Sequence, residues 1–165
     1  MSVIESKLHE LGLVLPEPMK LPPGVTLPFP WVRVHGNRAF ISGHGPQNAD
    51  GSIAKPLGKV GAEVSPEQAH IAARLVGLSI LASLKRELGD LDRVTAWLKI
   101  LGMVNSAPGF NQQPNVINGF TELILGLYGS QCGAHARSAV GMAQLPFDIP
   151  VEIEGEVEIA SVAIG

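Results

Sequence analysis

The last strand-like segment of the chain, residues 151–159, alternates strictly between apolar and acidic positions. A period of two places successive side chains on opposite faces of a strand. One face therefore carries Val151, Ile153, Val157 and Ile159, and the other carries Glu152, Glu154, Glu156 and Glu158. This pattern predicts a strand that covers a core with its apolar face.

An apolar segment that opens at Arg137 comes just before and is predicted to be a second strand. Residues 146–150 (P-F-D-I-P) lie between the two segments and predict a turn. Arg137 is the only strong cation in this part of the chain, and four carboxylates follow it on the last strand. A guanidinium held by a strand is a rigid fork that suits a carboxylate ligand, and a nearby glutamate could orient water or move a proton.

The longest helical pattern begins at Ser65, which takes the N-cap position. Pro66 stands at the first helical position, and Gln68 completes a capping box. The expected end is Gly89. An apolar stripe at helical spacing comprises Ala69, Ala72, Ala73, Val76, Ile80 and Leu84.

Two further helices are predicted. A short one follows Ser2, has Glu5 at capping-box spacing and ends near Gly12; its apolar residues are Ile4, Leu8 and Leu11. The other runs from Pro114 to Gly129 and carries Phe120, Leu123 and Leu127.

Six prolines between Pro16 and Pro30 predict an extended linker rather than a helix. The chain is therefore divided into residues 1–28, an N-terminal helix and proline-rich linker, and residues 29–165, one compact domain. A length of 165 residues is enough for one core and too short for two ordinary domains.

The remaining extended segments complete the fold. Residues 31–35 and 39–43 are predicted to pair as strands across a tight Gly-Asn turn, and residues 48–51 form a second turn. Residues 52–64 are interpreted as a loop with a short strand. Residues 94–104 are apolar with little alternation, which favours a central strand covered on both faces. The order β-β-β-α-β-α-β-β predicts an α+β fold, a single mixed sheet with two main helices on one face.

Composition narrows the function. The chain is 45% hydrophobic and only 16% charged, which is apolar for a water-exposed protein and would fit burial between subunits. A net charge of −3 gives no electrostatic case for a nucleic-acid partner, and none is expected. The single Cys132 allows no internal disulfide, and the start of the chain has no signal-peptide pattern. No apolar run is long enough for a membrane span, so a cytoplasmic location is expected.

No metal or cofactor is expected. The five histidines do not show the spacing of a zinc helix, and no cysteine pair exists. The G-H-G sequence at residues 43–45 is not a nucleotide-binding glycine loop.

Several segments resemble the YjgF/RidA family of small trimeric enamine/imine deaminases. The matches are A-R-S-A-V from residue 136, L-P at 145–146 and V-E-I-E from 151, together with F-P-W-V from 29 and F-I-S-G-H-G-P from 40. They extend from about residue 29 onward, so the N-terminal helix and most of the linker lie outside the family core. The family has a chorismate mutase-like fold, and some relatives carry the label endoribonuclease L-PSP.

The resemblance implies a homotrimer that hydrolyses reactive 2-enamine or 2-imine acids to 2-keto acids and ammonia at clefts between subunits. Arg137 would bind the substrate carboxylate. Glu152, with a backbone carbonyl at or near Ala139, would orient the water. Spacing alone does not separate Glu152 from Glu154; only the motif alignment selects Glu152.

Other family positions have two interpretations. Trp31 stands where deaminases often have tyrosine and is either a packing aromatic or a substrate contact. Gly43 either permits a close backbone approach or lines the cleft because a side chain would block it. Asn118 matches a cleft asparagine, with Asn115 as a rival.

His44 and His135 flank the matching motifs. Either could lie at the cleft rim as an acid or base, or serve as a hydrogen-bonded structural residue. At the level of function, a small-molecule carboxylate-binding protein of the same fold, without turnover, is the alternative to a deaminase.

Overall fold

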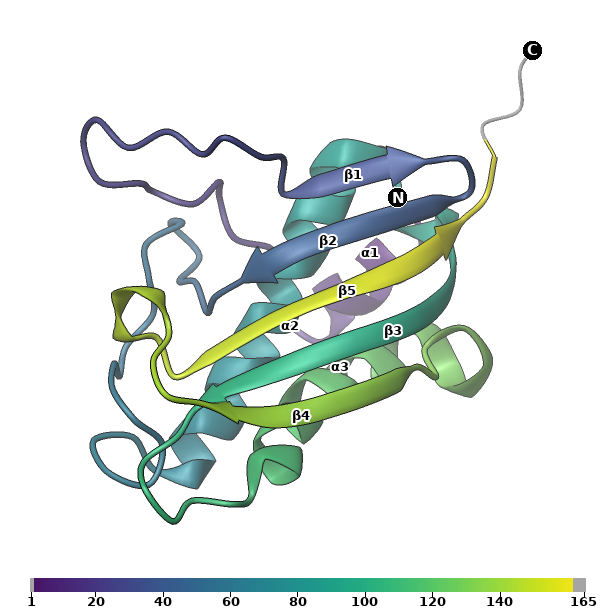
Figure 1. Cartoon of the computed structure of the whole chain (residues 1–165). Helices are drawn as coiled ribbons and strands as arrows, with labels where there is room; N and C mark the ends of the chain where they lie inside the picture. Colours follow the sequence, from purple (N-terminus) through teal and green to yellow (C-terminus); the bar gives the residue numbers. More distant parts are fainter. Residues whose placement is uncertain (1, 162–165) are drawn as a thin grey trace.

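The computed structural model describes residues 2–161 as one five-stranded sheet with helices on one face (Figure 1). The elements are α1 (Val3–Glu10), β1 (Val32–His35), β2 (Arg38–His44), α2 (Pro66–Leu88), β3 (Val94–Asn105), α3 (Gln113–Cys132), β4 (Ala136–Met142) and β5 (Val151–Ile159). Short 3₁₀ turns, η1 (Leu91–Arg93) and η2 (Pro146–Asp148), precede β3 and β5. The strand order is β1-β2-β5-β3-β4, with β3 and β4 parallel and the other neighbours antiparallel. The predicted α+β class is confirmed.

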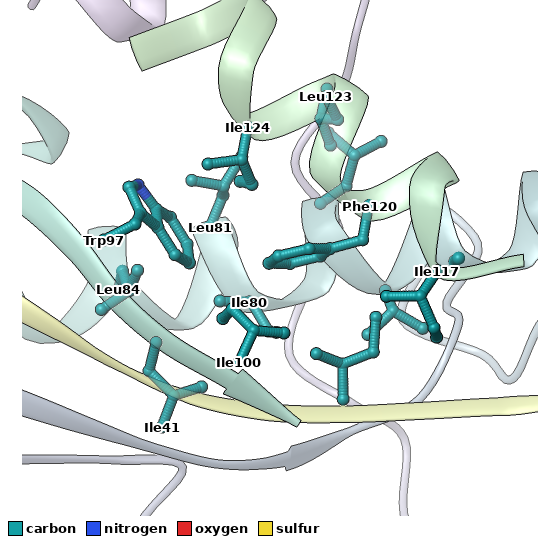
Figure 2. Packing of buried hydrophobic residues seen from close by; sticks show 14 of the residues in the cluster. Ile41, Ile80, Leu81, Leu84, Trp97, Ile100, Ile117, Phe120, Leu123 and Ile124 are labelled. Carbon is teal, nitrogen blue, oxygen red and sulfur yellow. The ribbon is translucent and has the colours of Figure 1, made fainter. Parts of the chain in front are cut away.

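The core lies between the sheet and the two long helices. Trp97 of β3 meets Phe120 of α3 edge to face, with ring centroids 5.8 Å apart, and Figure 2 shows both among the isoleucines and leucines of α2 and α3. Every residue of the apolar stripe predicted on α2 is buried. Ile4 and Leu8 of α1 belong to the same core cluster, so the N-terminal helix packs on the domain.

The helix ends follow the sequence signals. Ser65 and Gln68 form the reciprocal capping box of α2, and Gly89 ends that helix with a φ of 79°. Ser2 accepts a hydrogen bond from the Glu5 amide at the start of α1. In α3 the helical dihedrals are interrupted at Gly129, and one further turn reaches Cys132.

Two predictions for the strands are wrong. Residues 52–64 form only isolated bridges and no strand, because Gly58 and Gly61 have φ values of 119° and 95°, outside the extended region. The order after α1 is therefore β-β-α-β-α-β-β. In addition, β3 is covered on one face only, since Thr95 and Lys99 are exposed while Trp97 and Ile100 are buried.

The other face of the sheet carries no helix (Figure 1). Phe40 and Val140 are 42% and 37% exposed there, and β3 contributes the half-buried Leu101 and Met103. The even-numbered glutamates of β5 share this face, as the alternation predicts. We call this surface the open sheet face. Among the helices of the described residues, none has the length and apolar character needed to cross a membrane.

Candidate functional site

Glu152 lies against the backbone of Gly43, across the boundary between β5 and β2. The register of the two strands shifts between Ile41 and His44, which marks a bulge at this point. A Cβ built on Gly43 would lie 2.1 Å from Oε1 of Glu152. Only a residue without a side chain leaves room for the carboxylate in this position. Gly43 therefore permits the close approach and also lies at the site, so both interpretations of this glycine apply.

The carboxylate of Glu152 is partly removed from water. Burial raises its pKa above the ordinary value, and the negative charge of Glu154 two residues away adds to this effect. The carboxyl groups of Asp50 and Glu63, by contrast, have their pKa lowered by hydrogen bonds. A glutamate that holds its proton more tightly is suited to general acid or base chemistry near neutral pH.

A pocket of about 200 Å³ opens beside Glu152. Its walls come from the linker up to Trp31, the end of β2 and the turn before β5. These segments lie on the left in Figure 1. Its lining comprises Met19, Leu21, Val25, Leu27, Phe29, Trp31, Gly43, Gly45, Pro46, Gln47, Ile53, Pro146, Phe147, Ile149 and Glu152. We call this space the linker pocket. Glu152 is the one ionisable residue in its lining, so the pocket itself supplies no cation.

Trp31 forms part of the pocket wall and is held by two ring contacts. Its ring centroid lies 6.0 Å from that of Phe29, edge to face, and 4.9 Å from that of His44. The same indole therefore packs on its neighbours and faces the pocket.

His44 lies behind Trp31 and is only 3% exposed, so the rim position considered for it is wrong. Nδ1 donates to the Ser42 carbonyl at 2.6 Å, which leaves Nε2 to accept from the Ser83 hydroxyl at 2.8 Å. Burial lowers the pKa of His44 to about 4; the Ser42 hydrogen bond opposes this shift and the charge of Arg86 adds to it. His44 is thus a neutral, fixed support for the pocket wall.

The turn before β5 presents Phe147 at the pocket with a left-handed backbone. Phe147 and Asp148 have φ values of 58° and 56°, which are uncommon for residues other than glycine. The Asp148 carbonyl accepts a hydrogen bond from the Gly58 amide at 2.7 Å. Phe147 is 51% exposed, so the turn holds a large apolar side chain at the mouth of the pocket.

Arg137 lies on β4, the outer strand of the sheet, and its side chain reaches α3. Nη1 donates to Oγ1 of Thr121 at 2.9 Å and Nη2 donates to the Pro114 carbonyl at 3.1 Å. No carboxylate lies within ion-pair distance of it among residues 2–161. Burial lowers the pKa of Arg137 somewhat from its usual value, and the group remains a cation. The guanidinium is held in place yet has no anionic partner in the described chain.

His135 extends the same network. Its Nδ1 donates to the Gly133 carbonyl at 2.8 Å, so Nε2 accepts from Thr121 Oγ1 at 3.0 Å. Burial lowers the pKa of His135, and nearby Arg137 lowers it further against the opposing effect of the Gly133 hydrogen bond. Arg137, Thr121 and His135 therefore form one hydrogen-bonded set between β4 and α3.

Asn118 and Ala139 lie on the side of the sheet where Arg137 is found. Asn118 is half-buried on α3, while Asn115 is exposed and its carbonyl bonds to His70 at 3.0 Å. Ala139 pairs with Gly102 in the sheet and packs partly on the core.

The predicted residues thus form two groups in one chain. Trp31, Gly43 and Glu152 line the linker pocket, whereas Arg137 is two strands away from Glu152, because β3 lies between β4 and β5. The two side chains also project from opposite faces of the sheet, since Arg137 is level with buried Ile100 and Glu152 with Met103 of the open sheet face. A site that uses both groups needs a second copy of the chain.

The four glutamates of β5 have different surroundings. Glu156 pairs with Arg38 at 2.7 Å, and Glu158 accepts from the Thr95 hydroxyl at 2.8 Å. Glu154 is exposed, and Glu152 alone lines the linker pocket. The structure therefore separates residues that the alternating pattern treats as equivalent.

Sequence reasoning missed the linker as a wall of the pocket. A usable signal exists: apolar residues recur at odd positions among the prolines, at 19, 21, 25, 27, 29 and 31. In an extended segment this period places them on one side. Thr121 was also missed, and no local pattern indicates that it joins Arg137 to His135.

Comparison with known proteins gives a consistent result. No family model matches the chain. Protein TCP17 of Trypanosoma cruzi is 40% identical over 124 residues, which cover 75% of this chain and 76% of that protein. The solved structure of Atu1372 from Agrobacterium tumefaciens, a protein of unknown function, is 41% identical, has a TM-score of 0.84 and covers 96% of this chain and 93% of its own.

A third match carries a functional label. A protein of Shewanella oneidensis MR-1 described as a candidate endoribonuclease is 26% identical, has a TM-score of 0.83 and covers 94% of this chain and 99% of its own. These similarities, together with the motif resemblance around Gly43, Arg137 and Glu152, show that the chain belongs to the YjgF/RidA family.

Proposed function

We propose that the protein hydrolyses reactive 2-enamine or 2-imine acids to 2-keto acids and ammonia, at clefts between the subunits of a homotrimer. The observation that carries the proposal is the division of charge between the two residue groups. Glu152 has a raised pKa in a pocket that contains no cation, and Arg137 is held by neutral partners without an anion.

Arg137 of one subunit would bind the substrate carboxylate as a bidentate pair. The bonds to Thr121 and the Pro114 carbonyl already fix the guanidinium, so less conformational freedom is lost when the substrate binds. His135 supports Thr121 from the other side and is kept neutral, which avoids a second charge beside the anion.

Glu152 of the neighbouring subunit would act on the water. In the imine form, C2 of the substrate is electrophilic; the water oxygen bonds to C2 as Glu152 accepts the water proton. Glu152 returns that proton to the nitrogen, which gives a carbinolamine. It then takes the hydroxyl proton and delivers it to the amino nitrogen, so that the C–N bond breaks and ammonia leaves as the carbonyl forms. An enamine reaches the same state by taking a proton at C3. One carboxyl group that accepts and returns a proton is sufficient, and its raised pKa suits both steps.

The open sheet face supports assembly. Phe40 and Val140 are large exposed apolar residues on a sheet surface that no helix covers, and such patches commonly mark contacts between proteins. Family members are typically oligomeric. In a homotrimer this face would be buried, and each boundary would bring the Arg137 group of one subunit to the Glu152 group of the next.

A subunit-mixing experiment tests the shared cleft. Arg137→Ala and Glu152→Gln are each expected to be inactive alone on an imino acid that wild type accepts. After co-expression, a trimer with shared clefts regains activity in about one quarter of its clefts, because an intact cleft needs one subunit of each kind in the right order. No recovery in demonstrably mixed oligomers, or a clean monomer by light scattering at micromolar concentration, would contradict the shared site.

Turnover itself is tested by ammonia release from freshly generated 2-imino acids, compared with their spontaneous hydrolysis. The deaminase is supported if the protein accelerates the hydrolysis of at least one imino acid of the panel and Glu152→Gln abolishes this acceleration. Tight binding of 2-keto acids without acceleration of any imino acid would instead favour the carboxylate-binding alternative.

A further inference from the structure

The linker segment 16–30 forms one wall of the linker pocket and is fixed at both ends. At its first end, the amides of Glu17 and Lys20 donate to the carbonyls of Ala49 and Gly51, at 2.9 and 3.0 Å. The two backbones approach closely, since a Cβ on Gly51 would lie 2.3 Å from the Pro18 carbonyl oxygen. The 48–51 turn is thus the first attachment of the linker.

Its second end is attached to β2. The Ser42 hydroxyl donates to the Pro30 carbonyl at 2.8 Å, and the Ser42 amide donates to the Trp31 carbonyl at 3.0 Å. Ser42 directly precedes Gly43, so the linker returns to the sheet beside the backbone that supports Glu152. The position of the linker is therefore coupled to the catalytic end of the pocket.

Between the two attachments the linker contacts the pocket through side chains. Met19, Leu21 and Leu27 are half-buried and line it, while Val25 and Phe29 line it with 43% and 47% of their surface exposed. Among the described residues, the hydrogen bond within this stretch is local, from the Val25 amide to the Pro22 carbonyl. The middle of the linker is therefore held mainly by apolar contacts, which a ligand can extend.

We propose that residues 19–29 are the specificity-determining segment of the site and select 2-imino acids whose side chain is apolar and larger than a methyl group. This inference rests on the proposed function. Glu152 and Gly43 mark the reacting end of the pocket, and the linker forms the opposite wall, where the substrate side chain would lie.

Size and charge define the substrate class. The pocket measures about 200 Å³, and an apolar cavity of about 150 Å³ is enough to bind benzene. A branched aliphatic chain or an aromatic ring therefore fits, whereas a methyl group leaves most of the apolar wall without contact. An acidic side chain is disfavoured, because it would meet apolar walls in a pocket that supplies no cation.

The test compares imino acids generated in place from alanine, leucine, phenylalanine and glutamate by an amino acid oxidase. Wild type is expected to prefer the leucine-derived over the alanine-derived imine by about tenfold or more in kcat/KM, as for added methylenes in an apolar pocket. Leu27→Ala should lower this ratio about fivefold. Leu27→Trp, which fills the pocket, should invert the preference toward the alanine-derived imine.

Val14→Ala is the matched control, since Val14 is an apolar residue of the N-terminal region that is 64% exposed and does not line the pocket. It should leave the ratio unchanged. Thermal unfolding of each variant identifies any loss of folding, and the opposite directions expected for Leu27→Ala and Leu27→Trp separate a pocket effect from general damage.

Binding of the corresponding 2-keto acids, by titration calorimetry, separates this inference from the proposed function. If 4-methyl-2-oxopentanoate binds more tightly than pyruvate and Leu27→Ala removes the difference, the linker selects the side chain even in a protein without turnover. If imino acids are turned over with equal kcat/KM for small and large side chains, and the Leu27 variants behave as wild type, the deaminase stands and the role of the linker is refuted.

Discussion

The carboxylate of Glu152 and the backbone of Gly43 occupy positions that exclude a side chain between them, because a Cβ on Gly43 would meet Oε1 at 2.1 Å. The φ of Gly43 is not in the left-handed region, so the need for glycine is one of space rather than backbone conformation. The positions of these two pocket-lining residues are therefore coupled by contact.

Gly43→Ala is expected to displace the Glu152 side chain and to lower kcat at least tenfold, since a misplacement of about 1 Å can cost 100-fold in rate. Gly126→Ala is the control. Gly126 is an exposed glycine of α3 with no atom within 4 Å of a built Cβ, and alanine there should raise stability by about 1 kcal/mol. Steady-state kinetics and thermal unfolding measure both. Full activity in Gly43→Ala would mean that the position of Glu152 is not critical.

Glu152→Gln should lower turnover with little change in the affinity for 2-keto acids, because glutamine keeps the shape and loses the basicity. Glu156→Gln and Glu158→Gln serve as controls and should be nearly silent, since these carboxylates bind Arg38 and Thr95 away from the pocket. Glu154→Gln should have an intermediate effect, because it removes the charge that helps raise the pKa of Glu152. Equal effects from all four substitutions would assign the row a structural role.

The raised pKa of Glu152 also gives a sign for stability. Between the unfolded and folded pKa values the folded chain holds the extra proton. The contribution of Glu152 to the stability of the folded chain is therefore lost as pH rises through that window. Above the window the charged, half-buried carboxylate is unfavourable, and Glu152→Gln should raise Tm at pH 7 and leave it nearly unchanged at pH 4. Scanning calorimetry at the two pH values distinguishes this result from a uniform shift.

Arg137→Ala should weaken carboxylate binding by about 2–4 kcal/mol, the cost of a charge-assisted anchor in a partly desolvated site. Arg137→Lys should recover part of the charge but not the two-pronged geometry. Arg74→Ala, at an exposed position of α2, controls for the loss of one positive charge. Unchanged activity of Arg137→Ala on every imino acid that wild type accepts would remove Arg137 from the site.

His44 predicts a loss of stability in mild acid. Its pKa is about 4 in the folded chain and about 6.5 when exposed, so in this window only the unfolded chain takes up the proton and stability falls as pH falls. The full shift corresponds to about 3 kcal/mol of unfolding free energy. Urea unfolding from pH 7 to pH 4 should show this slope in wild type and a flatter one in His44→Gln. Identical slopes would locate the acid sensitivity elsewhere.

Much of the fold follows from local signals in the chain. The Ser65 capping box, Gly89 and the alternating segment 151–159 each define an element by short-range chemistry, and each forms as expected. Residues 52–64 are predicted to be a loop with a short strand, whereas the chain there follows a looped path with positive φ at Gly58 and Gly61 and forms isolated bridges alone. Residues 94–104 are apolar with little alternation, yet in one chain only one face of this strand is covered. Hydrophobicity in the sequence therefore does not distinguish a face covered by helices from the open sheet face.

The site was harder to predict than the fold. Motif similarity selected Gly43, Arg137 and Glu152, but only the strand order shows that Arg137 and Glu152 are two strands apart. The burial of His44 depends on Ser83, which is 39 residues away in the chain and belongs to α2. Such long-range partners leave no mark in the local pattern of residues.

The N-terminal helix has a consequence for the order in which the molecule folds. The amides of Val3 and Ile4 at the start of α1 donate to the Asp92 carboxylate at 2.7 and 2.9 Å, across almost ninety residues of chain. An eight-residue helix is not stable alone in water, so α1 gains these two long-range hydrogen bonds, in addition to its local Ser2 cap, only after η1 has formed beside α2 and β3. The linker that follows α1 is then ordered late, and the wall it contributes to the pocket is completed on a sheet that has already assembled. Amide exchange should accordingly be faster in α1 than in α2. The linker wall, which is the last part of the pocket to become ordered, would then belong to the least protected part of the native state.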